Sequence, residues 1–226
     1  MILRAFLILT LLVGCGRPLT ENEVAFAQTL HGDTLDVDRV RLVDGAPTRA
    51  VTFRRKARPR VTCRERLLPP RTDALVTSKP AAVALWTRVL FDSDWYLDDY
   101  LPDYPTEVNL VAAMLLAHEL THVWQWQNRD ITGYSPLKAA TEHQFTDDPY
   151  LFDIGAARQF SDFGYEQQGS IVEEFVCCRA LDPQAPRTQR LHALIAQAMP
   201  VAPLPQSREH DVRLPWDGVE IDGICR

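Results

Sequence analysis

The chain has 226 residues, of which 46% are hydrophobic, 24% charged and 9% aromatic, and this composition is typical of one globular domain with or without extensions. Its length is sufficient to bury a hydrophobic core. The formal net charge is −6, so no overall basic character favours nucleic acid as a partner.

The first 14 residues form a segment of their own. The apolar run from Ala5 to Val13 is too short to span a bilayer as a mature helix and is typical of a secretory signal. The run Leu12-Val13-Gly14-Cys15 resembles the lipobox of bacterial lipoproteins, in which the cysteine is lipidated. We therefore expect residues 1–14 to be a lipoprotein signal and Cys15 to anchor the protein to the cell envelope. Gly16 is not an aspartate, which favours the outer membrane in a Gram-negative cell; without lipidation the protein would be periplasmic or secreted.

The segment that follows carries the signals of one helix and several short strands. Thr20 to Glu23 has the form of a capping box and predicts a helix that Gly32 ends. Apolar and polar residues alternate from Leu35 to Val43, which predicts a strand. Thr48 to Phe53 and Val61 to Leu67 read as two further strands. Together these segments predict a small N-terminal β-region.

The middle of the chain predicts a strand, a loop and a long helix. Val83 to Phe91 favours a strand, and the acidic, aromatic segment from Asp92 to Tyr104 favours a loop that Pro105 ends. Thr106 is the expected cap of the next helix. The inward stripe of this helix consists of Leu110, Ala113, Met114, Ala117, Thr121 and Trp124.

The last third of the chain begins with a polar, aromatic insertion from Tyr134 to Phe160 that shows little periodicity. A second helix is expected from Ser161 or Asp162 to a point between Leu181 and Pro183, and a third from about Arg187 to Ala198. Prolines then predict an irregular tail. We therefore expect residues 15–183 to form one domain, followed by a C-terminal helix and tail over residues 184–226.

The strongest chemical signal is the run His118-Glu119-Leu120-Thr121-His122, which has the form H-E-x-x-H. On a helix this spacing places both imidazoles on one face, where they can bind one Zn²⁺, with Glu119 beside the metal as a candidate general base. A catalytic zinc site has three protein ligands and one open position for water. The metzincin pattern is excluded, because its glycine and third histidine are replaced by Gln125 and Asn128.

A glutamate from the second helix is the remaining source of a third ligand. Glu166, Gly169, Ser170, Glu173 and Cys177 fall on one face of that helix. The small residues Gly169 and Ser170 would let it approach the motif helix closely. Glu166 is the predicted ligand, and Glu173 is the alternative on the same face.

Other residues are candidates for the substrate side of the site. In zinc peptidases with this motif, the edge of a preceding strand pairs with an extended substrate, and Trp86 to Phe91 is the predicted edge. Tyr134, Tyr150 and Tyr165 are candidates to stabilise a developing oxyanion, and the sequence does not choose among them.

Four cysteines beyond Cys15 permit two disulfides in three pairings; they are Cys63, Cys177, Cys178 and Cys225. Cys177 and Cys178 are not expected to bond to each other, because adjacent residues of a helix point about 100° apart. The chain contains no C-x-x-C spacing, so a structural zinc knuckle is not expected.

Three blocks of sequence resemble the Vgr-related bacterial proteins, close to zinc metallopeptidase domains found beside contractile injection systems. The blocks are Arg17-Pro18-Leu19-Thr20 through Asp38-Arg39-Val40-Arg41, Leu116 to Gln125, and Tyr165 to Val172. The resemblance implies an α+β, zincin-like (gluzincin-like) fold, in which the small β-region precedes the H-E-x-x-H helix and a glutamate helix. It also implies peptidase activity. Ser170 departs from better-studied gluzincins, many of which have an aspartate there that orients a zinc-bound histidine.

The function that follows is zinc-dependent hydrolysis of a protein or peptide substrate. His118, His122 and Glu166 would hold the zinc, and Glu119 would take a proton from the attacking water. The alternative is a non-catalytic zinc-binding envelope lipoprotein or a secretion-system-associated protein. A membrane partner is expected only through the lipid anchor, and no oligomeric state is predicted.

Overall fold

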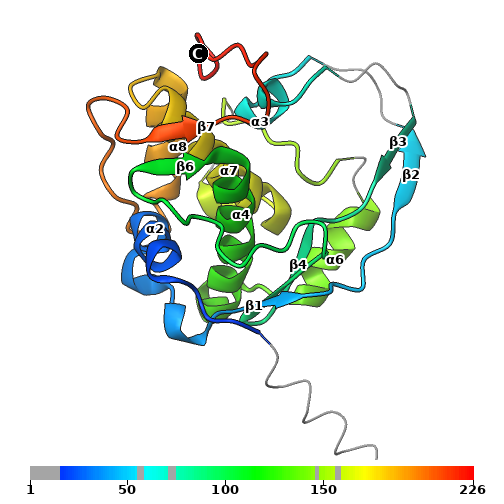
Figure 1. Cartoon of the computed structure of the whole chain (residues 1–226). Helices are drawn as coiled ribbons and strands as arrows, with labels where there is room; N and C mark the ends of the chain where they lie inside the picture. The colour runs from blue at the N-terminus through cyan, green and yellow to red at the C-terminus, as the bar shows by residue number, and fades with distance from the viewer. Residues whose placement is uncertain (1–15, 55–58, 71–74, 146–147, 156–158) are drawn as a thin grey trace, which may run out of the picture.

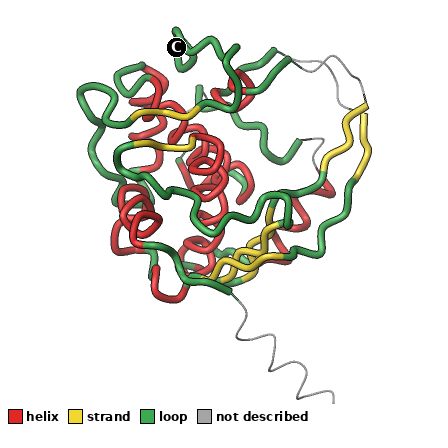
Figure 2. Tube along the Cα trace, in the orientation of Figure 1, coloured by secondary structure: helices red, strands yellow, loops and turns green. Residues whose placement is uncertain are grey.

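The computed structural model describes residues 16–54, 59–70, 75–145, 148–155 and 159–226 (Figure 1). The predicted signal segment and Cys15 lie outside these residues. No helix in the described part of the chain is long and apolar enough to cross a membrane. The architecture is α+β, with helices at the centre and short strands at the periphery (Figure 2).

The helices are α2 (Glu21–His31), α3 (Cys63–Leu67), α4 (Leu110–Gln127), α5 (Arg129–Thr132), α6 (Pro136–Phe145), α7 (Tyr165–Leu181) and α8 (Pro186–Ile195), with short 3-10 turns at Gly32–Thr34, Val37–Arg39 and Phe160–Asp162. The strands are β1 (Arg41–Asp44), β2 (Val51–Arg54), β3 (Leu75–Ser78), β4 (Ala82–Leu85), β5 (Arg88–Phe91), β6 (Glu107–Asn109) and β7 (Asp211–Arg213).

The first helix begins and ends where its capping signals predict. Thr20 Oγ1 accepts a hydrogen bond from the Glu23 backbone N–H at 3.2 Å, and the Glu23 carboxylate accepts one from the Thr20 N–H at 2.9 Å. Gly32 follows α2 with a φ of 52°, a conformation that favours glycine. The buried Glu23 also binds the guanidinium of Arg17 at 2.7 Å, which fixes the start of the described chain to α2.

The main sheet has the order β1-β5-β4, in which β5 pairs parallel with β1 and antiparallel with β4. The predicted strand from Leu35 to Val43 is only partly present, because Val37–Arg39 form a 3-10 turn before β1. The segment from Val83 to Phe91 is not one strand; the chain reverses at Trp86, whose φ is 59°. The predicted edge from Trp86 to Phe91 was therefore wrong, because β5 is central and the free edge belongs to β4.

A second, two-stranded sheet joins β2 and β3 and projects from the helices on the right of Figure 1. The segment between these strands contains α3, so the strand predicted from Val61 to Leu67 was wrong. The physical reason is a second capping box: Thr62 Oγ1 accepts from the Glu65 N–H at 3.2 Å, and the Glu65 carboxylate accepts from the Thr62 N–H at 3.3 Å.

Helix α4 runs through the centre of the molecule and packs along α7 (Figure 1). Its predicted inward stripe is fully buried. Thr106 is not its cap, because Glu107–Asn109 pair with β7 as β6, and the helix begins only after that strand. Asn109 caps it instead, accepting a hydrogen bond from the Ala112 N–H at 3.3 Å.

The insertion from Tyr134 to Phe160 contains a helix, α6, that its weak periodicity did not predict. Ser135 precedes the helix and accepts a hydrogen bond from the Lys138 N–H at 3.2 Å, while Pro136 occupies the first helical position. Serine followed by proline is a recognised start signal. Leu137 is 77% exposed, so α6 lacks the apolar stripe that periodicity detects.

The C-terminal segment packs against the helices that precede it. Helix α8 lies on α7, and β7 pairs parallel with β6, so the predicted irregular tail contains a strand. Two disulfides connect distant parts of the chain: Cys63 with Cys177, and Cys178 with Cys225. The two adjacent cysteines of α7 are therefore bonded outward to different segments, as their positions on a helix predict.

Candidate metal centre

Three side chains from α4 and α7 converge on one point. His118 and His122 lie one turn apart on α4, and their Nε2 atoms are 3.1 Å apart. Glu166, in the first turn of α7, places Oε2 at 3.3 Å from His118 Nε2 and 3.4 Å from His122 Nε2. All three residues are buried. Glu166, the glutamate predicted from the helix face, is thus the one whose carboxylate lies next to both histidines.

The size of this triangle can be compared with the geometry of zinc. Zinc binds histidine nitrogen and carboxylate oxygen at about 2.0–2.1 Å in a tetrahedron, so neighbouring ligand atoms lie about 3.3 Å apart. The three measured separations of 3.1, 3.3 and 3.4 Å match that value. The donor set, two imidazoles and one carboxylate, also leaves a fourth position open.

The close approach of α7 to α4 depends on a glycine. A Cβ at Gly169 would lie 2.9–3.1 Å from three atoms of the His118 ring, closer than side chains tolerate. A side chain from α6 also fixes the start of α7: Glu142 accepts hydrogen bonds from the Tyr165 N–H at 2.8 Å and the Glu166 N–H at 3.0 Å. The close packing at Gly169 and the hydrogen bonds to Glu142 together keep the Glu166 carboxylate next to the two histidines.

The other nitrogen of His122 is held by a chain of amide side chains. His122 Nδ1 lies 2.8 Å from Gln125 Oε1. Gln125 Nε2 donates to Gln168 Oε1 at 2.9 Å and to the backbone oxygen of Tyr165 at 3.1 Å. Gln168 in turn donates to the backbone oxygen of Phe163 at 2.8 Å. Because the Gln125 oxygen only accepts, this network places the proton on Nδ1 and leaves Nε2 for a metal.

The other nitrogen of His118 faces charged groups instead. Glu173 Oε2 lies 3.4 Å from His118 Nδ1, and the same oxygen lies 3.2 Å from Arg64 Nη1. Glu173, the alternative ligand, is thus behind His118 and not at the triangle of ligand atoms. It stands at ion-pair distance where an orienting carboxylate is needed, although neither His118 Nδ1 nor Ser170 Oγ makes a hydrogen bond to the described part of the chain.

The charges of the site act strongly on one another. Burial opposes the charged form of His118, but the carboxylates of Glu166 and Glu173 outweigh it and raise the pKa of His118 to about 10. Burial also raises the pKa of Glu119, against the lowering effect of the two histidines. For Glu173, Arg64 and His118 outweigh burial and lower its pKa. Without a metal, the carboxylates of the site therefore favour protonated histidines, and a cation that binds there would displace those protons.

Two of the three candidate tyrosines line the site. The ring of Tyr134 stacks on His122 with centroids 6.1 Å apart, and the ring of Tyr150 lies 6.0 Å from that of His118. Burial, followed by the charge of Glu166, raises the pKa of both hydroxyls, which keeps them protonated as donors. Tyr165 directs its hydroxyl to the backbone oxygen of Thr132 at 3.3 Å, away from the ligand atoms.

Several residues of the site were not predicted from the sequence. Gln125 lies three residues after His122 on the same helix face, so its spacing could have indicated a partner for that imidazole. Arg64 and Glu142 come from α3 and α6, two helices that the periodicity of the sequence does not reveal, and no local signal connects them to the motif.

Comparisons with known proteins place this geometry in context. No family model matches the chain. The type VI secretion system spike protein VgrG2b of Pseudomonas aeruginosa is 25% identical over 164 residues, which is 71% of this chain but only 13% of the length of VgrG2b. The solved structure of the effector domain of P. aeruginosa VgrG2b has a TM-score of 0.51 at 22% identity, covering 82% of this chain and 85% of that one. These matches support the resemblance to Vgr-related proteins, and the structural match shows that the chain shares the fold of that effector domain.

Proposed function

We propose that this protein is a zinc-dependent peptidase of the gluzincin type, with a zincin-like fold. His118, His122 and Glu166 would hold the zinc, and the observation that carries the proposal is the triangle of their ligand atoms, with sides of 3.1, 3.3 and 3.4 Å. A zinc ion bound there supplies a Lewis acid that lowers the pKa of a water molecule and polarises a peptide carbonyl.

Glu119 is the general base of this proposal. It is buried next to His118 on the motif helix, and burial raises its pKa above the usual value of a carboxyl group, a direction that favours a general base. Its carboxylate would take a proton from the attacking water and deliver it to the amine of the leaving peptide. Tyr134 and Tyr150 are the candidate donors to the oxygen that becomes negative in the transition state.

The free edge of the main sheet is the proposed binding site for the substrate backbone. Strand β4 packs against α4, which carries the motif. The Asp92 N–H donates to the Ala81 oxygen at 2.8 Å, and with the alternation of an antiparallel pair this turns the backbone groups of Ala82 and Ala84 away from β5. An extended peptide can pair with those groups, which favours a protein or peptide substrate over a small molecule.

The proposed location is the cell envelope, through a lipid on Cys15. The supporting observation is the lipobox-like run Leu12-Val13-Gly14-Cys15. Two disulfides in the fold agree with an oxidising compartment. Metabolic labelling with a palmitate analogue should mark the wild type and not Cys15→Ser; equal labelling of both would contradict lipidation.

A second candidate role is association with a type VI secretion system. It is favoured by the similarity to the spike protein VgrG2b, whose effector domain shares this fold. This role does not compete with peptidase chemistry. It would instead decide where and against which proteins the site is used.

The test combines metal content with turnover. The chain from residue 16 onward carries every described element and should bind about one zinc per chain. Glu119→Gln should keep that zinc and lose cleavage of a quenched fluorescent casein, whereas Glu21→Gln, a surface control on α2, should change neither. A wild type without zinc would contradict the proposal. Full zinc with no turnover in any variant would favour the non-catalytic zinc-binding alternative.

A further inference from the structure

Helix α3 lies outside the α4–α7 pair, and its first residue is tied to α7 by two contacts. The disulfide Cys63–Cys177 joins the first residue of α3 to α7, across a sequence separation of 114 residues. The backbone N–H of Cys63 also donates to Glu174 Oε2 at 2.6 Å. Glu174 is buried and forms an ion pair with Arg187 of α8 at 2.7 Å. The start of α3 is therefore anchored to a buried charge as well as to a covalent bond.

From this anchored start, α3 reaches the metal centre through one side chain. Arg64 follows Cys63 directly, and its Nη1 lies 3.2 Å from Glu173 Oε2. The same oxygen lies 3.4 Å from Nδ1 of His118, whose Nε2 belongs to the triangle of ligand atoms. A continuous line of contacts thus runs from the disulfide through Arg64 and Glu173 to a metal ligand.

The disulfide Cys63–Cys177 matters because neither α3 nor the ion pair would by itself keep Arg64 next to Glu173. A helix of five residues has little stability of its own. The Arg64 side chain is 52% exposed, and exposed ion pairs contribute only about 0–1 kcal/mol. The disulfide confines Arg64 to the neighbourhood of Glu173, so that the pair forms without ordering a free segment each time.

We propose that α3 is a clamp on the metal centre, in which Cys63–Cys177 holds Arg64 against Glu173 and Glu173 orients His118. The clamp rests on the proposed zinc site, but it adds a claim: zinc affinity depends on Arg64 and on a disulfide, neither of which touches the metal. Arg64 and Glu173 are positioning residues. Partners that orient a metal-bound histidine typically change metal affinity about 10- to 100-fold.

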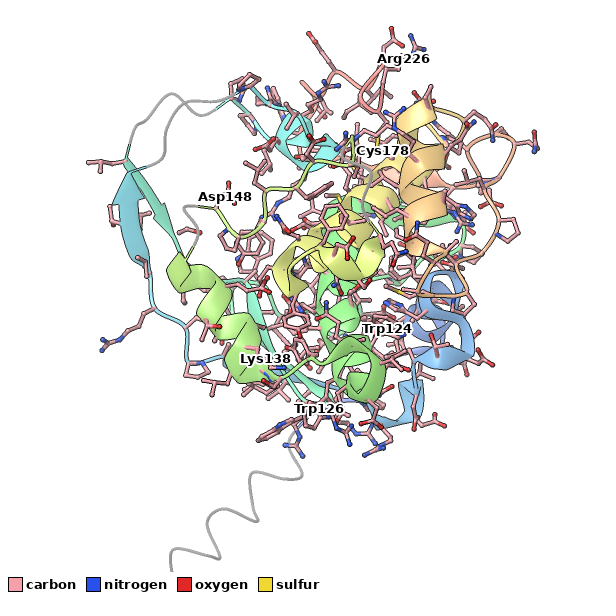
Figure 3. The ribbon with its side chains drawn as sticks, turned by 180° about the vertical axis from the view of Figure 1, so that it is seen from behind. Trp124, Trp126, Lys138, Asp148, Cys178 and Arg226 are labelled. Carbon is pink, nitrogen blue, oxygen red and sulfur yellow. A yellow bond between two sulfur atoms is a disulfide. The ribbon has the colours of Figure 1, made fainter. Side chains whose placement is uncertain are left out.

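The chain supplies a matched control for each part of the clamp. Cys178, which is labelled in Figure 3, is adjacent to Cys177 on the same helix, but its disulfide runs to Cys225, the residue before the C-terminal Arg226. Arg66 is on α3 with Arg64, but it donates to the backbone oxygens of Gly223 and Ile224 at 3.2 and 2.9 Å. Both controls remove an interaction of similar kind that leads away from His118.

The experiment measures zinc affinity by competition with a chromophoric chelator, on the chain from residue 16 onward. Arg64→Met and the double variant Cys63→Ser/Cys177→Ser should each bind zinc roughly tenfold more weakly than wild type. Arg64→Lys should recover part of the loss. Arg66→Met and Cys178→Ser/Cys225→Ser should stay within about twofold of wild type. Circular dichroism identifies any variant that fails to fold, and Arg64→Met and Arg64→Lys then decide the question.

A second readout follows the geometry of the site. The visible spectrum of bound Co²⁺ reports the field of its ligands, and it should change in Arg64→Met and remain that of wild type in Arg66→Met. Equal zinc affinities and equal spectra for Arg64→Met and Arg66→Met would overturn the clamp while leaving the zinc site intact. A wild type that binds neither zinc nor Co²⁺ would overturn both.

Discussion

The two histidines of the motif are supported by different chemistry. His122 relies on neutral amides, Gln125 on its own helix and Gln168 on α7. His118 relies on an ion pair, Glu173 with Arg64, in which the arginine comes from the disulfide-bonded helix α3. The neutral half of the site, around His122, is therefore built within α4 and α7. The charged half, around His118, also needs α3, which is far away in the sequence.

The difference follows from the cost of burying charge. An amide chain that ends on backbone oxygens satisfies its own donors and acceptors, so it needs no further partner. A buried carboxylate such as Glu173 needs an opposite charge close to it. Residues near it on α7 are apolar, small or acidic, and Arg64 of α3 supplies that charge. The charged half of the site is for this reason the half that a distant segment can control.

The largest predicted loss of zinc affinity follows substitution of Glu166, which lies next to both histidines. Glu166→Ala removes one of the three proposed ligands and should weaken zinc binding by about 3 kcal/mol, or roughly 100-fold, since complete structural sites bind with about 10–16 kcal/mol. Glu173→Ala should lose less, because its carboxylate lies behind His118. Chelator competition on the two variants checks this order, and a greater loss in Glu173→Ala would exchange their roles.

A second predicted effect concerns stability and arises where α2 packs against α4. His31 is fully buried next to Thr121, with its Nε2 3.4 Å from Thr121 Oγ1, and burial lowers its pKa from 6.5 to about 4. The unfolded chain therefore binds a proton below pH 6.5 that the folded chain does not bind until about pH 4. Between these values stability falls with falling pH, by about 2 kcal/mol at pH 5.

Urea unfolding in the presence of a chelator, at pH 7.5 and pH 5, measures this loss. His31→Gln should reduce the difference between the two pH values by about 2 kcal/mol, whatever its absolute stability. An unchanged difference would show that acid sensitivity resides elsewhere, for example at the charged half of the metal centre.

The third prediction tests the neutral half. Gln125→Leu removes the oxygen that fixes the proton on Nδ1 of His122 and should weaken zinc binding roughly tenfold. Gln168→Leu leaves that oxygen in place and should have a smaller effect. Isothermal titration with zinc distinguishes the two, and equal losses would mean that packing of the amides, and not the contact with His122, matters.

The smallest predicted effect is that salt weakens the charged half of the site and not the neutral half. Arg64 is half-exposed, so its ion pair with Glu173 is screened by electrolyte, whereas the buried amides are not. Raising NaCl from 0.05 to 1 M should weaken zinc binding of the wild type about two- to threefold more than that of Arg64→Met. Identical salt dependence in both proteins would contradict a functional role for the pair.

The helices that carry the proposed ligands were predictable because their signals are local. The buried stripe of α4, the spacing of His118 and His122, and the small residue Gly169 beside Glu166 all lie within single helices. The place of Glu173 was not predictable, since it depends on how α7 is rotated against α4, which Gly169 decides through its contact with His118.

The peripheral strands and the short helix α3 were harder to predict. Strand order is non-local, so nothing in the run from Val83 to Phe91 indicates that β1 would cover β5 and leave β4 at the edge. At Val61 to Leu67 a local signal existed, the capping box of Thr62 and Glu65. This signal indicates the helix that forms, whereas the pattern of apolar residues had predicted a strand.

X-ray absorption at the zinc edge tests the central claim most directly. The described residues contain one other cluster of metal-type side chains, Cys63, Cys178 and Cys225, whose sulfurs are in disulfides. We predict only nitrogen and oxygen neighbours at about 2.0–2.1 Å, with two imidazoles among them, and their loss in His118→Ala. Sulfur neighbours at about 2.3 Å, or a spectrum unchanged in His118→Ala, would contradict it.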